Sequence, residues 1–279
     1  TCTTSLIARK RNIKEVIWKV IYIGVDPDIA KLGPFTLSWH GVFGVIGGAL
    51  ATWLVFRLDR SGLNVNKSHL SEVLLWGIIG GLIGSRTVHV IDYWEFYSAN
   101  PRAILAIHEG GHAIWGAILG GVVTVAIYAR IKRYPVGNLL DSGAIGLILA
   151  QAIGRIGDII NGEHLSAYTG LPWGFIYTHP NSPGYGLPAQ HPAVAYEMLW
   201  DLAIFGLLWK LKGRIQPSGS LFLIYLSLYA FGRFFLSFLR HDSNFVGLGL
   251  NQPQWISLTV LVVAVPWLLI RINKESLKR

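Results

Sequence analysis

Cysteine is almost absent from this chain: its 279 residues include a single one, so no disulfide can form within it. Charged residues are also scarce, at 14% of the sequence, whereas soluble globular domains contain about 25%. These shortages exclude a disulfide-stabilised scaffold and a typical water-soluble domain.

Hydrophobic residues and glycine are abundant instead, at 52% of the chain and 32 residues respectively. Apolar runs of roughly 20 residues recur, the length at which a helix crosses about 30 Å of hydrocarbon, and glycine suits close helix packing in lipid. The pattern predicts an all-α polytopic membrane protein with seven transmembrane helices, at about residues 38–56, 70–92, 112–129, 138–156, 192–209, 219–239 and 253–271.

Lysine and arginine are distributed unevenly between these spans. The connections after the first, third and fifth spans contain three basic residues each, and the tail from residue 271 contains four. The second and sixth connections contain one each, and residues 156–190 contain none. The positive-inside rule therefore predicts a cytoplasmic C-terminus and, with seven spans, an N-terminus outside. This topology accounts for the net charge of +9 without a nucleic-acid partner.

Two segments outside the spans have distinctive compositions. Residues 9–19 combine five basic residues with isoleucine and valine, as in an amphipathic helix at a membrane interface, which conflicts with an outer N-terminus because it prefers the cytoplasmic face. Residues 162–190 contain four prolines, which favours irregular structure or short strands. We expect an N-terminal segment at 1–37 and a membrane domain at 38–279, with an external excursion at about 162–190.

The end of the fourth span carries unusual polarity. Its apolar, glycine-rich sequence runs into four polar side chains: Arg155, Asp158, Asn161 and Glu163. An arginine at hydrocarbon depth costs roughly 2.5–3.5 kcal/mol, so it usually faces a partner or a ligand. Asp158 lies near Arg155 at a helical spacing and could simply neutralise it.

Arg86 and Arg233 also fall within glycine-bearing spans. Each could reach toward headgroups or pair with a carbonyl. Three such arginines together favour a shared anion site, because the guanidinium fork binds phosphate through two parallel hydrogen bonds. The predicted ligand is a phospholipid headgroup.

Further polar groups gather in the fifth and sixth spans. The fifth opens with His191, Tyr196 and Glu197. On the sixth, Tyr229 and Arg233 are one turn apart and share a face with Arg240.

Residues 108–112 match the H-E-x-x-H pattern of zinc proteases. That mechanism needs a continuous helix to align both histidines, and the glycines at 110 and 111 oppose one. We therefore predict a turn here and no metal site.

Together these motifs resemble the prolipoprotein diacylglyceryl transferase family of bacterial inner-membrane enzymes, over nearly the whole chain. The family pattern G-R-x-G-N-F-I-N-G-E is similar to residues 154–163, R-H-P-x-Q-L-Y-E to 191–197, and Y-G-x-x-R-x-x-x-E-x-x-R to 229–240. Arg86 matches the arginine of the family's G-G-R segment. In the family, the region matching the excursion forms an arm and head over the membrane, where a precursor would approach.

The resemblance implies transfer of the diacylglyceryl group of phosphatidylglycerol to a cysteine thiol of a lipoprotein precursor, with release of glycerol phosphate and without a cofactor. Only a thiolate attacks, and a free thiol titrates near pH ~8.5. The resemblance assigns Arg155 and Arg233 to the phosphate, and Tyr229 to headgroup positioning or proton relay. The other implied substrate-binding residues are Arg86, Asp158, Asn161, Gly162, Glu163, His191, Tyr196, Glu197 and Arg240.

Some positions depart from the family pattern. The histidine of the family's G-G-M-S-F-H-G-G segment, often proposed as the base, aligns with Trp115, which cannot accept a proton. His40 replaces a tyrosine, and Asp158 replaces an asparagine. His112, three positions before Trp115, and His40 are the two candidates for the base.

Two functions remain open on the sequence alone. The first is a divergent transferase with a relocated base. The second is a catalytically altered member that binds phospholipid as a structural subunit of a membrane complex, with other membrane subunits as partners. The arginines that match the family pattern are compatible with both hypotheses.

Overall fold

The computed structural model describes residues 20–32, 35–59, 67–106, 111, 113–241 and 245–277. This part of the chain is mostly helical, which confirms the all-α part of the predicted fold class. Six helices in it are long and apolar enough to cross a membrane: Trp39–Leu58, Leu70–Asp92, Ile114–Ile131, Val136–Asn161, Ser220–Leu239 and Gln252–Glu275. The amphipathic helix predicted at 9–19 lies outside the described residues.

Helix α7 (Ala193–Leu211) corresponds to the fifth predicted span but is not among these six. Its 19 residues are long enough to cross a membrane. It contains three charged residues: Glu197, Asp201 and Lys210. Length and hydropathy therefore confirm six of the seven predicted spans.

The other helices are α2 (Trp39–Asp59), α3 (Lys67–Asp92), α4 (Trp94–Ala99), α5 (Ile114–Ile131), α6 (Val136–Asn161), α8 (Ser220–Leu236) and α9 (Gln252–Ser276), with 3-10 turns η1 (Pro101–Leu105) and η3 (Ser237–Leu239). Short strands are β1 (Ile21–Ile23), β2 (Asp28–Leu32), β3 (Phe35–Ser38), β4 (Phe175–Tyr177), β5 (Phe245–Gly247) and β6 (Leu250–Asn251). The chain divides into two compact units that alternate along the sequence. Unit 1 is Thr1–Ala51, Leu147–Arg214 and Leu223–Arg279, and unit 2 is Thr52–Gly146 and Ile215–Phe222.

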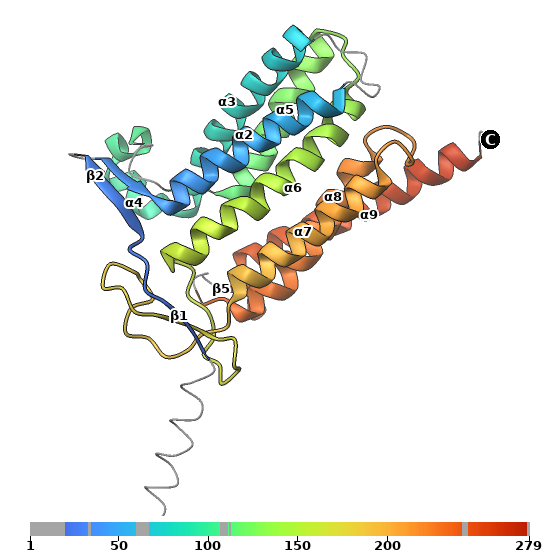
Figure 1. Ribbon diagram of the computed structural model, residues 1–279. Helices are drawn as coiled ribbons and strands as arrows, with labels where there is room; N and C mark the ends of the chain where they lie inside the picture. The colour runs from blue at the N-terminus through green and yellow to red at the C-terminus, as the bar shows by residue number, and fades with distance from the viewer. Residues whose placement is uncertain are drawn as a thin grey trace, which may run out of the picture. The chain divides into compact units, whose positions relative to one another are not determined.

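In unit 2, helices α3 and α5 run side by side (Figure 1). Each has glycines four residues apart, at 80 and 84 on α3 and at 116 and 120 on α5. A Cβ added at Gly84 would lie only 2.8 Å from the Cα of Gly120. The backbones therefore meet where no side chain would fit, as the glycine content predicts.

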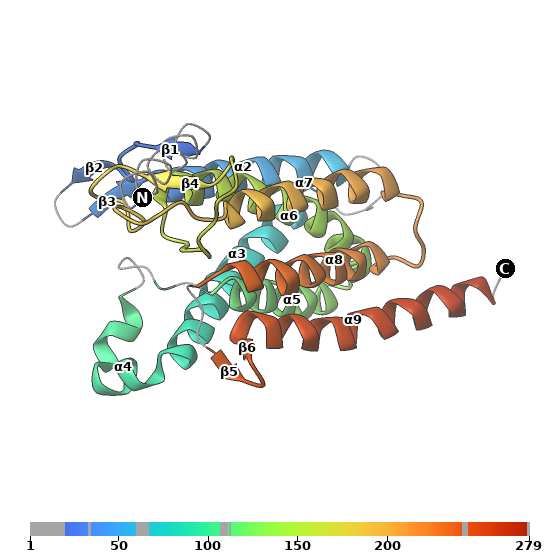
Figure 2. The ribbon, with the colours of Figure 1, turned by 90° about the horizontal axis from the view of Figure 1, so that it is seen from below.

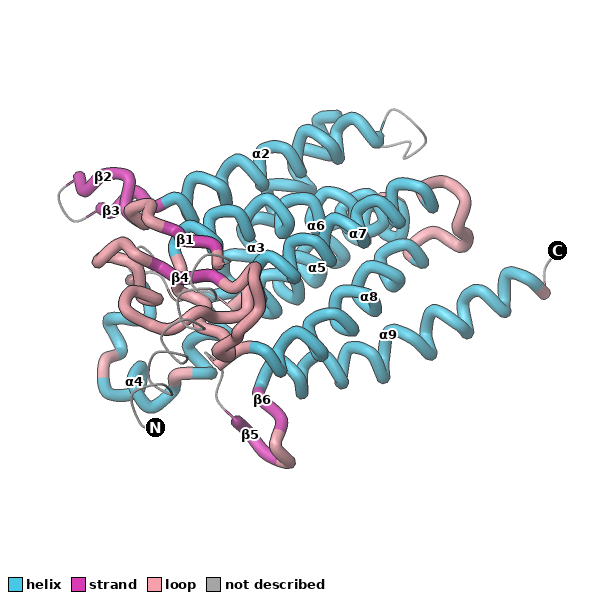
Figure 3. Tube along the Cα trace, turned by 60° about the horizontal axis from the view of Figure 1, so that its bottom comes forward, coloured by secondary structure: helices cyan, strands magenta, loops and turns pink. Residues whose placement is uncertain are grey.

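In unit 1, helices α7, α8 and α9 run alongside one another (Figures 1 and 3). Trp200 on α7 packs over Gly232 of α8 and donates from Nε1 to the Leu228 carbonyl, 3.0 Å away. Helix α9 starts at a capping box in which Asn251 and Gln254 satisfy each other's backbone N–H groups. These contacts hold α7 and α8 in a fixed register beside the site described below.

The excursion at 162–190 is mostly irregular, with the single strand β4, as its prolines predict. Strand β4 pairs in parallel with β1, and the hairpin of β2 and β3 precedes α2; Figures 2 and 3 show these strands among the loops of unit 1. The Tyr177 hydroxyl donates to the Ile159 carbonyl at 3.0 Å, and burial raises the pKa of Tyr177 above its ordinary value. That hydrogen bond ties the excursion to the end of α6.

Candidate functional site

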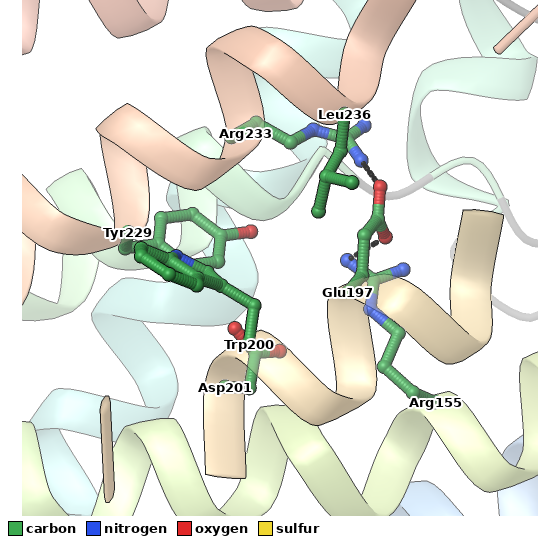
Figure 4. Close-up of a pocket in the computed structure, with 7 residues that line it drawn as sticks. All are labelled: Arg155, Glu197, Trp200, Asp201, Tyr229, Arg233 and Leu236. Atoms are coloured by element: carbon green, nitrogen blue, oxygen red, sulfur yellow. Dashed lines mark hydrogen bonds and ion pairs between the residues drawn. The ribbon is translucent and has the colours of Figure 1, made fainter. Parts of the chain in front are cut away.

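A small pocket is lined by side chains of α6, α7 and α8 in unit 1 (Figure 4). Its lining residues are Arg155, Glu197, Trp200, Asp201, Tyr229, Arg233 and Leu236. Five of these seven side chains carry a charge or a hydroxyl group, so the pocket is suited to a polar ligand.

Glu197 on α7 is buried and joins three arginines. Its Oε2 lies 2.9 Å from Nη2 of Arg155, and its Oε1 accepts from Arg233 and lies 3.1 Å from Nη1 of Arg240. Figure 4 shows the carboxylate between the guanidinium groups of Arg155 and Arg233. One carboxylate thus fixes guanidinium groups supplied by α6, α8 and the residue after η3.

Five side chains form a closed ring around this point. Oδ2 of Asp158 lies 3.0 Å from Nη1 of Arg155. Arg155 is paired with Glu197, which is also paired with Arg240. Nη2 of Arg240 is 2.8 Å from Nδ1 of His164, and Nε2 of His164 is 3.6 Å from Asp158 Oδ2. Because arginine only donates, Nδ1 of His164 accepts and its Nε2 carries the proton that faces Asp158.

The ring has a branch at Asp158. Its Oδ1 is hydrogen-bonded to Nδ1 of His40, in the first turn of α2 and 118 residues away in sequence. Gly157 permits this approach, because a Cβ there would lie 2.6 Å from the Cα of His40. The His40 side chain is 54% exposed, whereas that of Asp158 is 6% exposed. His40 and Asp158, which both depart from the family pattern, are therefore in direct contact.

Donor atoms of His40, Asp158 and Glu163 lie within 4.8 Å of one another. The guanidinium of Arg155 on Asp158 is a cationic neighbour that opposes a metal ion at this place.

Oδ2 of Asp201 and Nε of Arg233 are buried polar atoms of the pocket without a hydrogen-bond partner among the described residues. Asp201 is 2% exposed. Leaving such a group unsatisfied costs about 1–3 kcal/mol. The pocket is therefore suited to a ligand that presents both an acceptor, for Arg233, and a donor, for Asp201.

Asp201 and His164 are functional candidates that sequence reasoning missed. Asp201 had a signal, since it is an acidic residue within an apolar span, one turn after Glu197 and on the same helix face. His164 had no sequence signal beyond its place next to Glu163. Tyr229 was predicted and lines the pocket, with its ring stacked on Tyr225 at 6.0 Å.

Five predicted substrate-binding residues lie around the loop after α6 and the start of α7, outside the pocket lining: Asn161, Gly162, Glu163, His191 and Tyr196. Asn161 Oδ1 and His191 Nδ1 are buried without a hydrogen-bond partner in the described part of the chain. Gly162 has φ of +69°, which a side chain would strain. The Tyr196 hydroxyl accepts from Nε1 of Trp173 at 2.7 Å. Their role as substrate contacts stays a prediction.

Arg86 belongs to unit 2, where it holds a loop. Its guanidinium donates to the carbonyls of Ala103, Ile104, Ala106 and Gly111. It also lies 5.2 Å from the centre of the Tyr97 ring. Its assignment to phosphate stays a prediction, and His112 lies outside the described residues.

Comparison with known proteins places this arrangement in context. A family model described as prolipoprotein diacylglyceryl transferase matches residues 27–270. A phosphatidylglycerol–prolipoprotein diacylglyceryl transferase of Dehalococcoides mccartyi is 37% identical over 256 residues, which cover 91% of this chain and 96% of the relative. Proteins of the same name from Nostoc sp. (35% identical; 90% and 92% covered) and Limosilactobacillus reuteri (34%; 91% and 94%) are similar over comparable lengths. The chain belongs to the prolipoprotein diacylglyceryl transferase family.

Proposed function

We propose that this protein transfers the diacylglyceryl group of phosphatidylglycerol to the cysteine thiol of a lipoprotein precursor and releases glycerol phosphate. The observation that carries the proposal is the buried pocket in which Glu197 fixes three arginines. The relatives named above carry this activity in their names.

Arg155 and Arg233 are the proposed phosphate ligands. Both line the pocket, and the buried Nε of Arg233 has a hydrogen to donate that no described residue accepts. A phosphate oxygen supplies that acceptor. Because Glu197 already holds the two guanidinium groups in place, they can stabilise the charge on the leaving glycerol phosphate without reorganising.

Asp201 is the proposed partner of the headgroup. Its unsatisfied Oδ2 accepts a hydrogen bond, and the glycerol of phosphatidylglycerol carries hydroxyl donors. One ligand with a phosphate at the arginines and a hydroxyl at Asp201 would give hydrogen-bond partners to both Nε of Arg233 and Oδ2 of Asp201. Tyr229, also in the lining, completes the contact with the headgroup.

The proposed location is the bacterial cytoplasmic membrane, with α7 as the fifth of seven spans. The N-terminus lies outside and the C-terminus lies in the cytoplasm, as the distribution of basic residues favours. The excursion at 162–190 then lies at the outer face, where it would meet the precursor.

The direct test is complementation of cells depleted of their own transferase. We expect this chain to restore lipoprotein modification, and failure of a well-expressed, inserted chain would contradict the proposal.

Arg155→Ala and Arg233→Ala are each expected to weaken phosphatidylglycerol binding, measured as lipid retained by the purified protein. The control is Arg214→Ala, whose residue is exposed and lies after α7, outside the pocket. Unchanged lipid occupancy in both variants would remove the headgroup assignment.

The second hypothesis, a phospholipid-binding subunit without turnover, is not favoured. The relatives named above carry the transferase name over 90% or more of this chain.

A further inference from the structure

The reaction proposed above requires a group that removes the thiol proton, and the arginine pocket does not provide one. Arginine stays protonated and cannot accept. Glu197 is occupied by three guanidinium groups, and the unsatisfied oxygen of Asp201 is assigned above to the headgroup hydroxyl. The base must therefore lie next to the pocket, on a side chain that a protein substrate can reach.

We infer that His40 is the general base for the precursor thiol and that Asp158 is its positioning residue. This inference rests on the proposed transferase activity. Asp158 accepts from Nδ1 of His40, which places the ring proton on that nitrogen and leaves the lone pair on Nε2. A carboxylate that orients a histidine in this way also stabilises the imidazolium that forms.

The position of His40 suits this role. Its side chain is 54% exposed, so a cysteine on another protein can approach the ring, whereas Asp158 is buried beneath it. The charged groups that face the ring are Asp158, Glu163 and Arg155. The carboxylate of Glu163, 3.7 Å from Nδ1, adds a second anion beside the imidazolium.

Asp158 also connects the base to the phosphate site. Its other oxygen, Oδ2, pairs with Arg155 at 3.0 Å, and Arg155 lines the pocket. One carboxylate thus contacts both the group that receives the proton and a group that holds the leaving phosphate. The two halves of the reaction are adjacent within unit 1.

The transfer is a single displacement at carbon. Nε2 of His40 takes the thiol proton, and the thiolate attacks the glyceryl carbon that bears the phosphate ester. The carbon–sulfur bond forms as the carbon–oxygen bond breaks, and glycerol phosphate leaves with the electron pair. The proton then passes from His40 to the departing phosphate or to solvent.

The test uses the full chain in phosphatidylglycerol vesicles with a precursor peptide that contains one cysteine. His40→Ala is expected to lower kcat by about 10²–10⁴-fold at pH 7, with little change in KM for the lipid. Added imidazole should restore part of the rate, and the rate should rise steeply as pH approaches about 8.5, where the thiol ionises unaided. The matched control is His241→Ala, whose residue is exposed and lies outside the pocket.

Asp158→Asn separates positioning from proton transfer. It is expected to lower kcat, and combining it with His40→Ala should cost little beyond His40→Ala alone, since a positioning residue acts through its base. Full additivity of the two effects would overturn the pairing.

Other outcomes are equally decisive. If the wild-type protein is active and the His40→Ala variant keeps its rate and pH profile, the assignment of His40 as base is wrong and the proposed function still stands. A variant that loses lipid binding and is rescued by neither imidazole nor high pH also overturns the assignment, because that shows a structural role. A wild-type rate abolished by a chelator and restored by zinc would indicate a metal ion at His40 and overturn it too. An inactive wild-type protein overturns the proposed function, and this assignment with it.

Discussion

At the scale of single residues, Glu197 is the side chain on which the site depends. It is 4% exposed and contacts Arg155, Arg233 and Arg240. Removing one partner of a buried ion pair costs about 3–5 kcal/mol, because a charge is left uncompensated. Here one substitution would remove a carboxylate that three cations share, and Arg155 would keep its pair with Asp158.

Glu197→Gln is therefore expected to lower the thermal stability of the purified protein markedly, by a free energy of about 3–5 kcal/mol. Thermal unfolding in detergent measures this. Glu95→Gln is the control, since Glu95 is exposed on α4. Equal melting temperatures for the two variants would show that Glu197 does not organise the arginines.

Asp201 tests the headgroup assignment. Asp201→Leu is expected to raise KM for phosphatidylglycerol by about 5–150-fold, the equivalent of about 1–3 kcal/mol for one buried hydrogen bond, and Asp201→Asn should raise it less because it keeps an acceptor oxygen. The comparison lipid is phosphatidylmethanol, which has the phosphate but no headgroup hydroxyl. Wild-type protein should prefer phosphatidylglycerol, and Asp201→Leu should lose that preference. An unchanged preference would contradict the assignment.

The sequence was informative about single residues wherever a charge fell in an apolar span. Arg155 and Arg233 stood out for that reason, and both line the pocket. The hydrogen bond between His40 and Asp158 could not be predicted, because it joins residues 118 positions apart and depends on how α2 packs on α6. Pairing with a carbonyl was one of the expected roles of Arg86, and its donors do go to backbone carbonyls of its own unit.

At the scale of elements, glycine spacing decides how α3 and α5 pack. Gly84→Ala and Gly120→Ala would each place a methyl group against the backbone of the other helix. Overpacking of this kind costs about 1–3 kcal/mol, so both variants should unfold at lower temperature than wild type. Gly48→Ala on α2 is the control, since a Cβ there meets nothing within 4 Å. If all three variants behave alike, close packing at these glycines is not a source of stability.

Helix α7 shows that charged functional residues make a membrane span harder to predict from hydropathy. Its position followed from the apolar pattern, but it is not among the six clear spans, and two of its three charged residues, Glu197 and Asp201, build the site. The prolines predicted an irregular excursion, whereas the parallel pairing of β1 with β4 joins distant segments and has no local signal.

At the scale of the whole molecule, the proposed orientation can be tested with cysteine labelling. In a Cys2→Ser background, Gly170→Cys should react with a membrane-impermeant thiol reagent in intact cells whose outer face is accessible, because the excursion is expected outside. Arg214→Cys should react only after the membrane is permeabilised. Both positions are exposed, so a reversed pattern would place the excursion in the cytoplasm.

The central claim is that this chain catalyses diacylglyceryl transfer through its buried arginine pocket, and a product assay tests it most directly. Purified protein, phosphatidylglycerol vesicles and a precursor peptide are combined, and the peptide and released glycerol phosphate are quantified by mass spectrometry. The account predicts a diacylglyceryl thioether on the peptide cysteine, equimolar glycerol phosphate, and loss of both products with Arg155→Ala or Arg233→Ala. Bound phosphatidylglycerol without thioether formation by the wild-type protein would contradict it.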